Sequence, residues 1–255
     1  HVDLDDASHN ALRDFLDQHY ITATHPRPAD NDDGPSMLVR RDAAGGYSFT
    51  TIQRGRAILQ EHASADKVIS TCMRHLTELA CAYAEHMAVL HGAALHNANH
   101  RLLLCNHSGS GKTTLALALA RRGYELIHDD ILPIKPDGRI SAARVPMTIK
   151  QGAWPQVASL GWKLPDASHT WNARSSKLIP PPITSAVAEN LPTIVVFPSY
   201  REGATKTLTP LATQTAVQRL LASECVINDR SEENLRALIR WLGGLCYWQL
   251  DYGDT

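Results

Sequence analysis

The stretch that decides the fold runs from Leu102 to Asp130 and reads LLLCNHSGSGKTTLALALARRGYELIHDD. An apolar run ends in a glycine-rich turn, a segment rich in leucine and alanine follows, and a second apolar run closes on two aspartates. This order predicts a strand, a phosphate-binding loop, a helix and a second strand that ends in an acid pair. We therefore expect a site for a nucleoside triphosphate and magnesium.

Each loop residue has a chemical reason for its place. Gly109 and Gly111 flank Ser110 because backbone N–H groups can surround phosphate oxygens only where no side chain intrudes. Lys112 adds positive charge for the β- and γ-phosphates, and Thr113 offers a hydroxyl ligand to magnesium. The N-terminus of the following helix also favours a bound anion. The residues expected to contact the nucleotide are His107, Ser108, Gly109, Ser110, Gly111, Lys112, Thr113 and Thr114.

Asn106 stands where the usual loop pattern has its first glycine. Asn is the non-glycine residue that best tolerates a positive φ, so we expect it to replace glycine there through its backbone angle. The alternative for the whole stretch is an ordinary strand, turn and helix with a chance Gly-Lys-Thr. The strand before the loop and the helix after it favour the phosphate-binding interpretation.

Asp129 and Asp130 close the second apolar run, where a doubly wound sheet places its ligands. One carboxylate suits magnesium, and the other suits the proton of an attacking hydroxyl. Repulsion between the two acids raises the pKa of one of them, as a base requires. The alternative is a solvated strand end, or a cap for the next segment.

With the run LHGAAL at 90–95, this core resembles the kinase domain of HPr kinase/phosphorylase and, more distantly, phosphoenolpyruvate carboxykinase. The family loop G-x-S-G-x-G-K-[ST] is matched over 106–113 except for its first glycine. The family segment RGH-x-L-x-x-DD is matched over 122–130, with Tyr124 in place of the histidine. The active-site histidine of the family is matched by His91.

The resemblance implies a role for each matched residue. Asp129 would accept the proton of the acceptor, Thr113 and Asp130 would hold the metal, and His91 and Lys112 would complete the catalytic group. The later segments resemble short HPr-kinase-like proteins found beside genes for modified peptides, including lasso peptides. Some of those proteins phosphorylate a serine, or the C-terminal end, of a precursor peptide.

The implied fold class is α/β: a P-loop kinase core of this type, with a mixed sheet, flanking helices and a small N-terminal β-rich appendage. We expect residues 1–88 to form the appendage and residues 89–255 the catalytic domain. Helices are predicted over 7–18, 65–88, 113–122, 212–222 and 231–242, with Asp66 as a cap and a loop over 22–35. Strands are predicted within 36–58 and over 90–95, 102–104, 124–127, 193–197, 205–211 and 245–250, while residues 154–182 are the least predictable.

The composition argues against several classes of partner, although it leaves local basic patches open. Lys and Arg number 25 against 26 Asp and Glu, so no global field attracts nucleic acid or an anionic membrane. No apolar run approaches the ~18 to 20 residues that span a bilayer. The five cysteines form no CxxC pair, which favours a reducing compartment. We expect a cytoplasmic protein without nucleic-acid or membrane partners.

Basic and aromatic residues beyond the core are candidates for binding the acceptor. Lys150, Arg174 and Lys177 suit an acceptor or the γ-phosphate, although a solvated surface role is the alternative. The tryptophans of the proline-containing region, Trp154, Trp162 and Trp171, suit either a peptide-binding wall or ordinary packing.

The phosphate-binding loop, the acid pair and the family resemblance together predict an ATP- and Mg²⁺-dependent kinase. By the resemblance, the γ-phosphoryl group would go to a serine-type hydroxyl of a peptide or protein, including a ribosomally made precursor peptide. The alternatives are a kinase for a small-molecule hydroxyl or carboxylate and a non-catalytic nucleotide-binding switch. The sequence does not identify the acceptor, and it does not show whether the reverse phosphorolysis occurs or whether the chain forms a homo-oligomer. It also leaves open whether ATP or GTP is preferred and where the true N-terminus lies.

Overall fold

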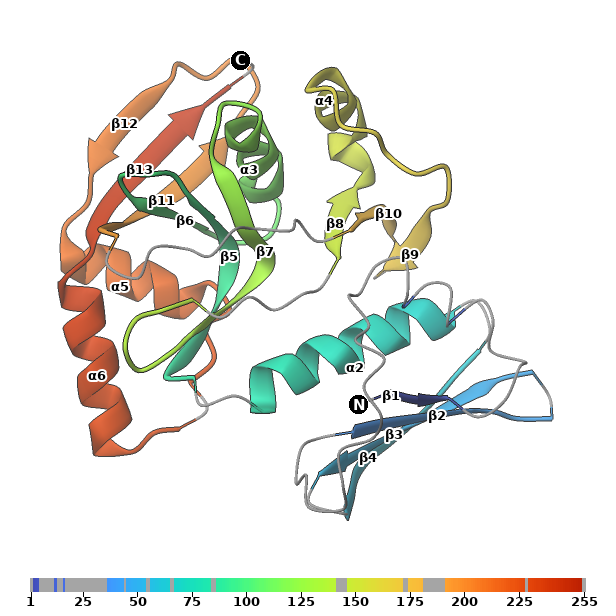
Figure 1. Cartoon of the computed structure of the whole chain (residues 1–255). Coiled ribbons are helices and arrows are strands. Elements are labelled where there is room, and N and C mark those ends of the chain that lie inside the picture. The colour runs from blue at the N-terminus through green and yellow to red at the C-terminus, as the bar shows by residue number, and fades with distance from the viewer. Residues whose placement is uncertain are drawn as a thin grey trace. The chain divides into compact units, whose positions relative to one another are not determined.

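The computed structural model describes residues 2–4, 12, 16, 36–43, 45–53, 56–64, 67–83, 86–140, 146–171, 174–180, 191–227 and 229–253. The chain divides into two compact units (Figure 1). The first holds His1–Ala84, Arg144–Gln151 and Pro165–Pro181, and the second holds Glu85–Ala143, Gly152–Leu164 and Pro182–Thr255. Two later stretches thus join the N-terminal residues, which the sequence did not indicate.

The first unit combines strands with one long helix. Its four-stranded sheet has the order β1-β2-β3-β4, with antiparallel pairing from β2 to β4 as predicted, and α2 packs on β3. Alternate strand residues such as Val39 and Phe49 are fully buried and join Cys72 of α2 in one core. A second sheet has the order β8-β10-β9. The bounds are β1 Val2–Leu4, β2 Ser36–Arg41, β3 Tyr47–Gln53, β4 Arg56–Ala63, α2 Val68–Tyr83, β8 Met147–Lys150, β9 His169–Trp171 and β10 Arg174–Ile179.

Some predictions for this region fall on residues outside the described ranges. They are the loop over 22–35, the Asp66 cap and most of the helix over 7–18. Leu12 and Leu16 of that helix are described, and both are buried in the core of the first unit.

The second unit is built on a mixed six-stranded sheet of order β12-β13-β11-β6-β5-β7. β6, β11 and β13 run parallel, and β5 is antiparallel to both β6 and β7. β6 and β7 therefore share a direction, although β5 lies between them. This confirms the α/β class with a mixed sheet. The bounds are β5 Ala88–His96, β6 Arg101–Cys105, β7 Glu125–Ile134, β11 Thr193–Tyr200, β12 Thr207–Pro210 and β13 Cys246–Tyr252.

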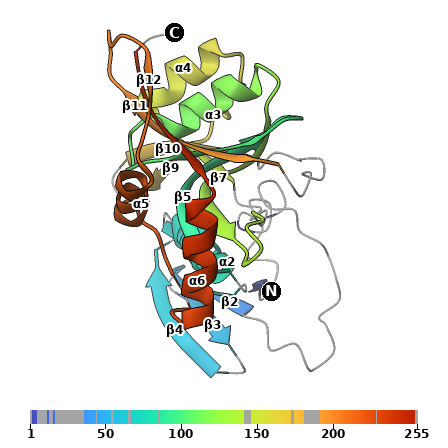
Figure 2. The ribbon, with the colours of Figure 1, turned by 90° about the vertical axis from the view of Figure 1, so that its left-hand side faces the viewer.

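Helices flank this sheet in two pairs, as Figures 1 and 2 show. α5 and α6 pack on one face, where they share a core with alternate residues of β6, Leu103 and Cys105. α3 contacts β5, β6 and β7 and also α4, while its buried Leu117 lies outside that core. The bounds are α3 Lys112–Ala120, η3 Gln151–Ala153, α4 Trp154–Ser159, α5 Thr213–Ala222 and α6 Glu232–Gly243. Within the described residues, no helix is long and apolar enough to cross a membrane.

The prediction that the second strand ends at the two acids is wrong. β7 continues to Ile134 because it pairs along the whole of β5, and its residues beyond the acids are largely buried. β6 is shorter: its last residue, Cys105, pairs with Gly92, and Gly92 pairs with Asp130 on its other side. The acids therefore lie beside the loop because β6 ends at their level.

Candidate functional site

The loop between β6 and α3 has the conformation that its glycines allow. Gly109 and Gly111 both have positive φ, at 89° and 94°. A Cβ atom on Gly111 would overlap the Tyr252 hydroxyl and would lie 3.2 Å from Cβ of Tyr200. Since a side chain here meets both a strained backbone and two tyrosines, only glycine fits at position 111.

Hydrogen-bond donors gather at this loop. Ser110 is almost fully buried, yet its hydroxyl has no hydrogen-bond partner within the described part of the chain. A buried polar group without a partner is costly and usually marks a ligand or a bound water. The first backbone N–H groups of α3 also have no partner within the helix, and they follow directly on Ser110 and Gly111. The loop is therefore equipped to bind an anion.

Lys112 lies over the loop. Its side chain is 7% exposed, and its ammonium donates hydrogen bonds to the carbonyls of Asn106 at 2.7 Å and His107 at 3.0 Å. The charge is thus held along the curve of the loop backbone, where a phosphate oxygen would meet both the ammonium and the N–H groups. His107 and Ser108 are themselves exposed, and Thr114 is partly buried in the first turn of α3.

The expected reason for Asn106 is wrong. The described non-glycine residues with positive φ are Asp130 and Glu224, so Asn106 does not replace glycine through its backbone angle. Its side chain acts instead. The amide donates to the carbonyl of Pro198 at 2.8 Å, and its oxygen accepts from the backbone N–H of His107 at 2.9 Å. Asn106 therefore ties the start of the loop to β11.

Thr113 and Asp129 meet directly. The Thr113 hydroxyl donates to Oδ2 of Asp129 at 2.9 Å. Asp129 is 4% exposed. Burial, followed by the charge of Asp130, raises the pKa of the Asp129 carboxyl to about 7, while Thr113 and Lys112 act in the opposite direction. The sequence placed Asp130 with Thr113 at the metal, whereas the structure places Asp129 next to Thr113.

Asp130 points to a different neighbour. Its Oδ1 lies 3.4 Å from Nδ1 of His91, and its side chain is 46% exposed. The backbone φ of 87° is unusual for a residue other than glycine, and such strain concentrates at functional sites. Glu224 approaches the same His91 nitrogen at 3.8 Å. His91 thus stands between two carboxylates from separate segments.

Two tyrosines that sequence reasoning missed support the loop. The backbone N–H of Tyr200 donates to the carbonyl of Ser110 at 3.2 Å, and the Tyr252 hydroxyl donates to the carbonyl of Gly111 at 3.3 Å. The two rings meet edge to face with centroids 5.5 Å apart. A usable signal exists: each tyrosine lies shortly after the end of a predicted strand, 193–197 or 245–250, and parallel strands bring their carboxyl ends to one edge of a sheet.

The remaining candidates lie elsewhere. Lys150, Arg174 and Lys177 belong to the first unit, on β8 and β10, and not to the unit that holds the loop. Trp162 packs on α3, where its Nε1 donates to the carbonyl of Leu117 at 3.3 Å and the guanidinium of Arg121 lies over its ring. Its contacts there are those of a packing residue.

Magnesium fits one part of this arrangement. Among the described residues, no group of three or more His, Cys, Asp or Glu side chains could hold a metal ion. Magnesium at a nucleotide, however, needs only one or two protein oxygen ligands, because phosphates and water supply the rest. The Thr113 hydroxyl and the Asp129 carboxylate are oxygen ligands of this kind, so the residues fit the ion.

No protein-family model matches this chain, and a search of the curated proteins finds no match either.

Proposed function

We propose that this chain is an ATP- and magnesium-dependent kinase that transfers the γ-phosphoryl group to a serine-type hydroxyl of a peptide or protein. The observation that carries the proposal is the hydrogen bond from Thr113 to Asp129 beside the buried Lys112. It puts a hydroxyl, a carboxylate and an ammonium at one end of a glycine-rich loop. Phosphoryl transfer depends mainly on such positioning and on neutralising charge.

The phosphates would lie in the loop. Ser110, the N–H groups at the start of α3 and Lys112 supply donors and positive charge for their oxygens. Thr113 and Asp129 would hold the magnesium ion, which neutralises phosphate charge when bound. We assign Asp129 to the metal, in place of the Asp130 that the sequence suggested, because it is the acid that the Thr113 hydroxyl contacts.

Asp130 would act on the acceptor. It is the more exposed of the two acids, so an incoming hydroxyl can reach it. The carboxylate accepts the hydroxyl proton as the acceptor oxygen bonds to the γ-phosphorus, and the bond from that phosphorus to the β–γ bridging oxygen breaks to release ADP. His91 orients the Asp130 carboxylate from 3.4 Å.

The peptide acceptor is supported by the resemblance to peptide-modifying kinases, and a screen tests it. Candidate serine-containing peptides are incubated with ATP and magnesium, and mass spectrometry should show the gain of one phosphate. Lys112→Met should slow the gain about 100-fold to 1,000-fold. A small hydroxyl compound that saturates the enzyme without any peptide would favour a small-molecule kinase. Tight ATP binding without turnover on any acceptor would favour a switch.

A further inference from the structure

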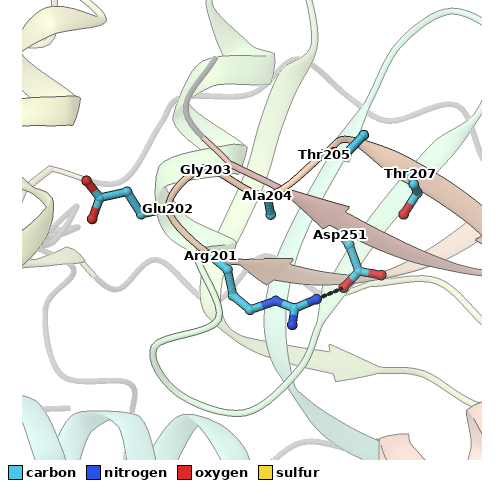
Figure 3. A pocket seen from close by; sticks show the side chains of 7 residues that line it. All are labelled: Arg201, Glu202, Gly203, Ala204, Thr205, Thr207 and Asp251. Carbon is cyan, nitrogen blue, oxygen red and sulfur yellow. Dashed lines mark ion pairs between the residues drawn. The ribbon is translucent and has the colours of Figure 1, made fainter.

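An open cavity lies at the end of β11, and none of its lining residues has a role assigned above. It has a volume of about 420 Å³ and is lined by residues 201–205 of the turn after β11, by Thr207 of β12 and by Asp251 of β13 (Figure 3). Its volume falls in the ~300 to 1,000 Å³ range of small-molecule sites. The lining is polar in character, with a guanidinium, two carboxylates and two threonine hydroxyls.

The cavity adjoins the phosphate loop through the backbone. Tyr200, which donates to the carbonyl of Ser110, immediately precedes the first lining residue, Arg201. The N–H of Arg201 donates in turn to the carbonyl of Tyr252 at 2.9 Å. Tyr252 follows the lining residue Asp251 and reaches the loop with its hydroxyl. The cavity therefore lies directly beyond the two strands whose tyrosines support the loop.

The order of the strands gives a bound nucleotide its direction. Thr113 and Asp129 mark the metal and γ-phosphate end, and Asp129 lies on β7, at one edge of the sheet. β11 and β13 lie on the other side of β6, the strand that leads into the loop. A triphosphate with its γ end toward β7 must extend its nucleoside toward β11 and β13, where the cavity is.

On these grounds, and resting on the proposed function, we propose that the cavity of residues 201–205, Thr207 and Asp251 binds the nucleoside half of the nucleotide. Asp251 would accept hydrogen bonds from the ribose hydroxyls. Its Oδ1 already accepts from Nε2 of Gln249 at 3.2 Å and lies 3.6 Å from Nη2 of Arg201, which orient the carboxylate. Arg201 is 71% exposed and would stack its planar guanidinium on the base.

The test compares ligands with and without a nucleoside. Dissociation constants for ATP and for inorganic tripolyphosphate, both with magnesium, are measured by calorimetry on the full chain. Asp251→Ala and Arg201→Ala should each weaken ATP binding about two- to tenfold, as expected for the loss of one hydrogen-bonding or stacking contact, and should leave tripolyphosphate binding unchanged. Lys112→Met should weaken both ligands. Glu233→Gln is the matched control, since Glu233 is an exposed acid in the first turn of α6 and does not line the cavity.

The outcomes separate this assignment from the proposed function. If the wild-type chain binds ATP and both cavity variants bind it equally well, the cavity does not hold the nucleoside. Equal loss of ATP and tripolyphosphate in these variants also overturns the assignment, since it indicates damage to the phosphate loop. If the wild-type chain binds neither ligand, the proposed function fails and this assignment fails with it. Thermal unfolding of each variant shows that a lost affinity is not a lost fold.

Discussion

Two buried polar clusters, one in each unit, resemble each other in burial and in their shifted pKa values but differ in the arrangement of charge. In the first unit, His75 is buried on α2 against the Phe49 ring, with the Glu61 carboxylate 3.4 Å away. In the second unit, Asp129 is buried against Thr113 near Lys112. Both have pKa values shifted mainly by burial. A shifted pKa therefore does not distinguish a site from a structural cluster.

The difference lies in how charge is arranged. Around His75, Arg74 forms ion pairs with both Glu61 and Glu78, so each acid has a cation beside it. Around the loop, two acids stand next to each other in sequence, and the cation is bonded to neutral carbonyls. In the first cluster both acids are paired with a cation of the chain, whereas in the second an anion and a metal ion would balance the charges.

The largest effects should come from separating the two acids. Asp130→Asn removes the proposed base and should lower kcat about 100-fold to 10,000-fold at any magnesium concentration. Asp129→Asn should instead raise the magnesium concentration needed for half-maximal rate, by about tenfold or more. Titrating the rate of peptide phosphorylation with magnesium checks both expectations. Asp137→Asn, in an exposed turn, controls for the loss of one negative charge.

An opposite pattern would restore the assignment that the sequence suggested. If magnesium dependence shifts in Asp130→Asn, while Asp129→Asn loses rate at saturating magnesium, then Asp129 is the base and Asp130 the metal ligand.

The next largest effect tests whether the cations of the two clusters have different roles. Lys112→Met removes the cation from the loop and should lower kcat/KM about 100-fold to 1,000-fold with little change in stability. Arg74→Met removes a cation from the other cluster and should lower the free energy of unfolding by about 1 kcal/mol or less, because the ion pairs are partly exposed. Urea unfolding and kinetics on both variants are the measurements. A large kinetic loss in Arg74→Met would show that the two clusters do not differ in this way.

A smaller effect concerns the support of the loop. Gly111→Ala places a methyl group on the Tyr252 hydroxyl at a φ of 94°, and should destabilise the second unit by about 1 to 3 kcal/mol. Tyr252→Phe removes the overlapping oxygen, so the double variant should recover part of that loss. Urea unfolding of the wild type, the two single variants and the double variant gives the coupling free energy between positions 111 and 252. Strict additivity would mean that the tyrosine does not restrict Gly111.

Local patterns predict the parts of this site that are local. The glycines of the loop, Lys112 and the helix after it follow from neighbouring residues alone, and the α/β class follows from the order of the elements. The length of β7 does not, since it depends on pairing with β5 over residues far away in sequence. Whether Asp129 or Asp130 contacts Thr113 depends on which face of β7 each side chain lies on. The role of the Asn106 side chain does not follow from neighbouring residues, because its partner, Pro198, lies on a strand far away in sequence.

The smallest effect is a pH dependence of stability that comes from the cluster around His75. Burial, followed by the charge of Arg74, lowers the pKa of His75, and the facing carboxylates Glu61 and Glu78 only partly offset this. The unfolded chain therefore binds a proton at this residue more readily than the folded chain does. The stabilising contribution is present above the ordinary histidine pKa of about 6.5 and is lost as the pH falls below it. Urea unfolding of the wild type and of His75→Gln between pH 8 and pH 5 should show their free energies of unfolding converging on acidification. Parallel curves would show that His75 has the same pKa in the folded and unfolded states, so that burial would not shift its pKa as it shifts that of Asp129.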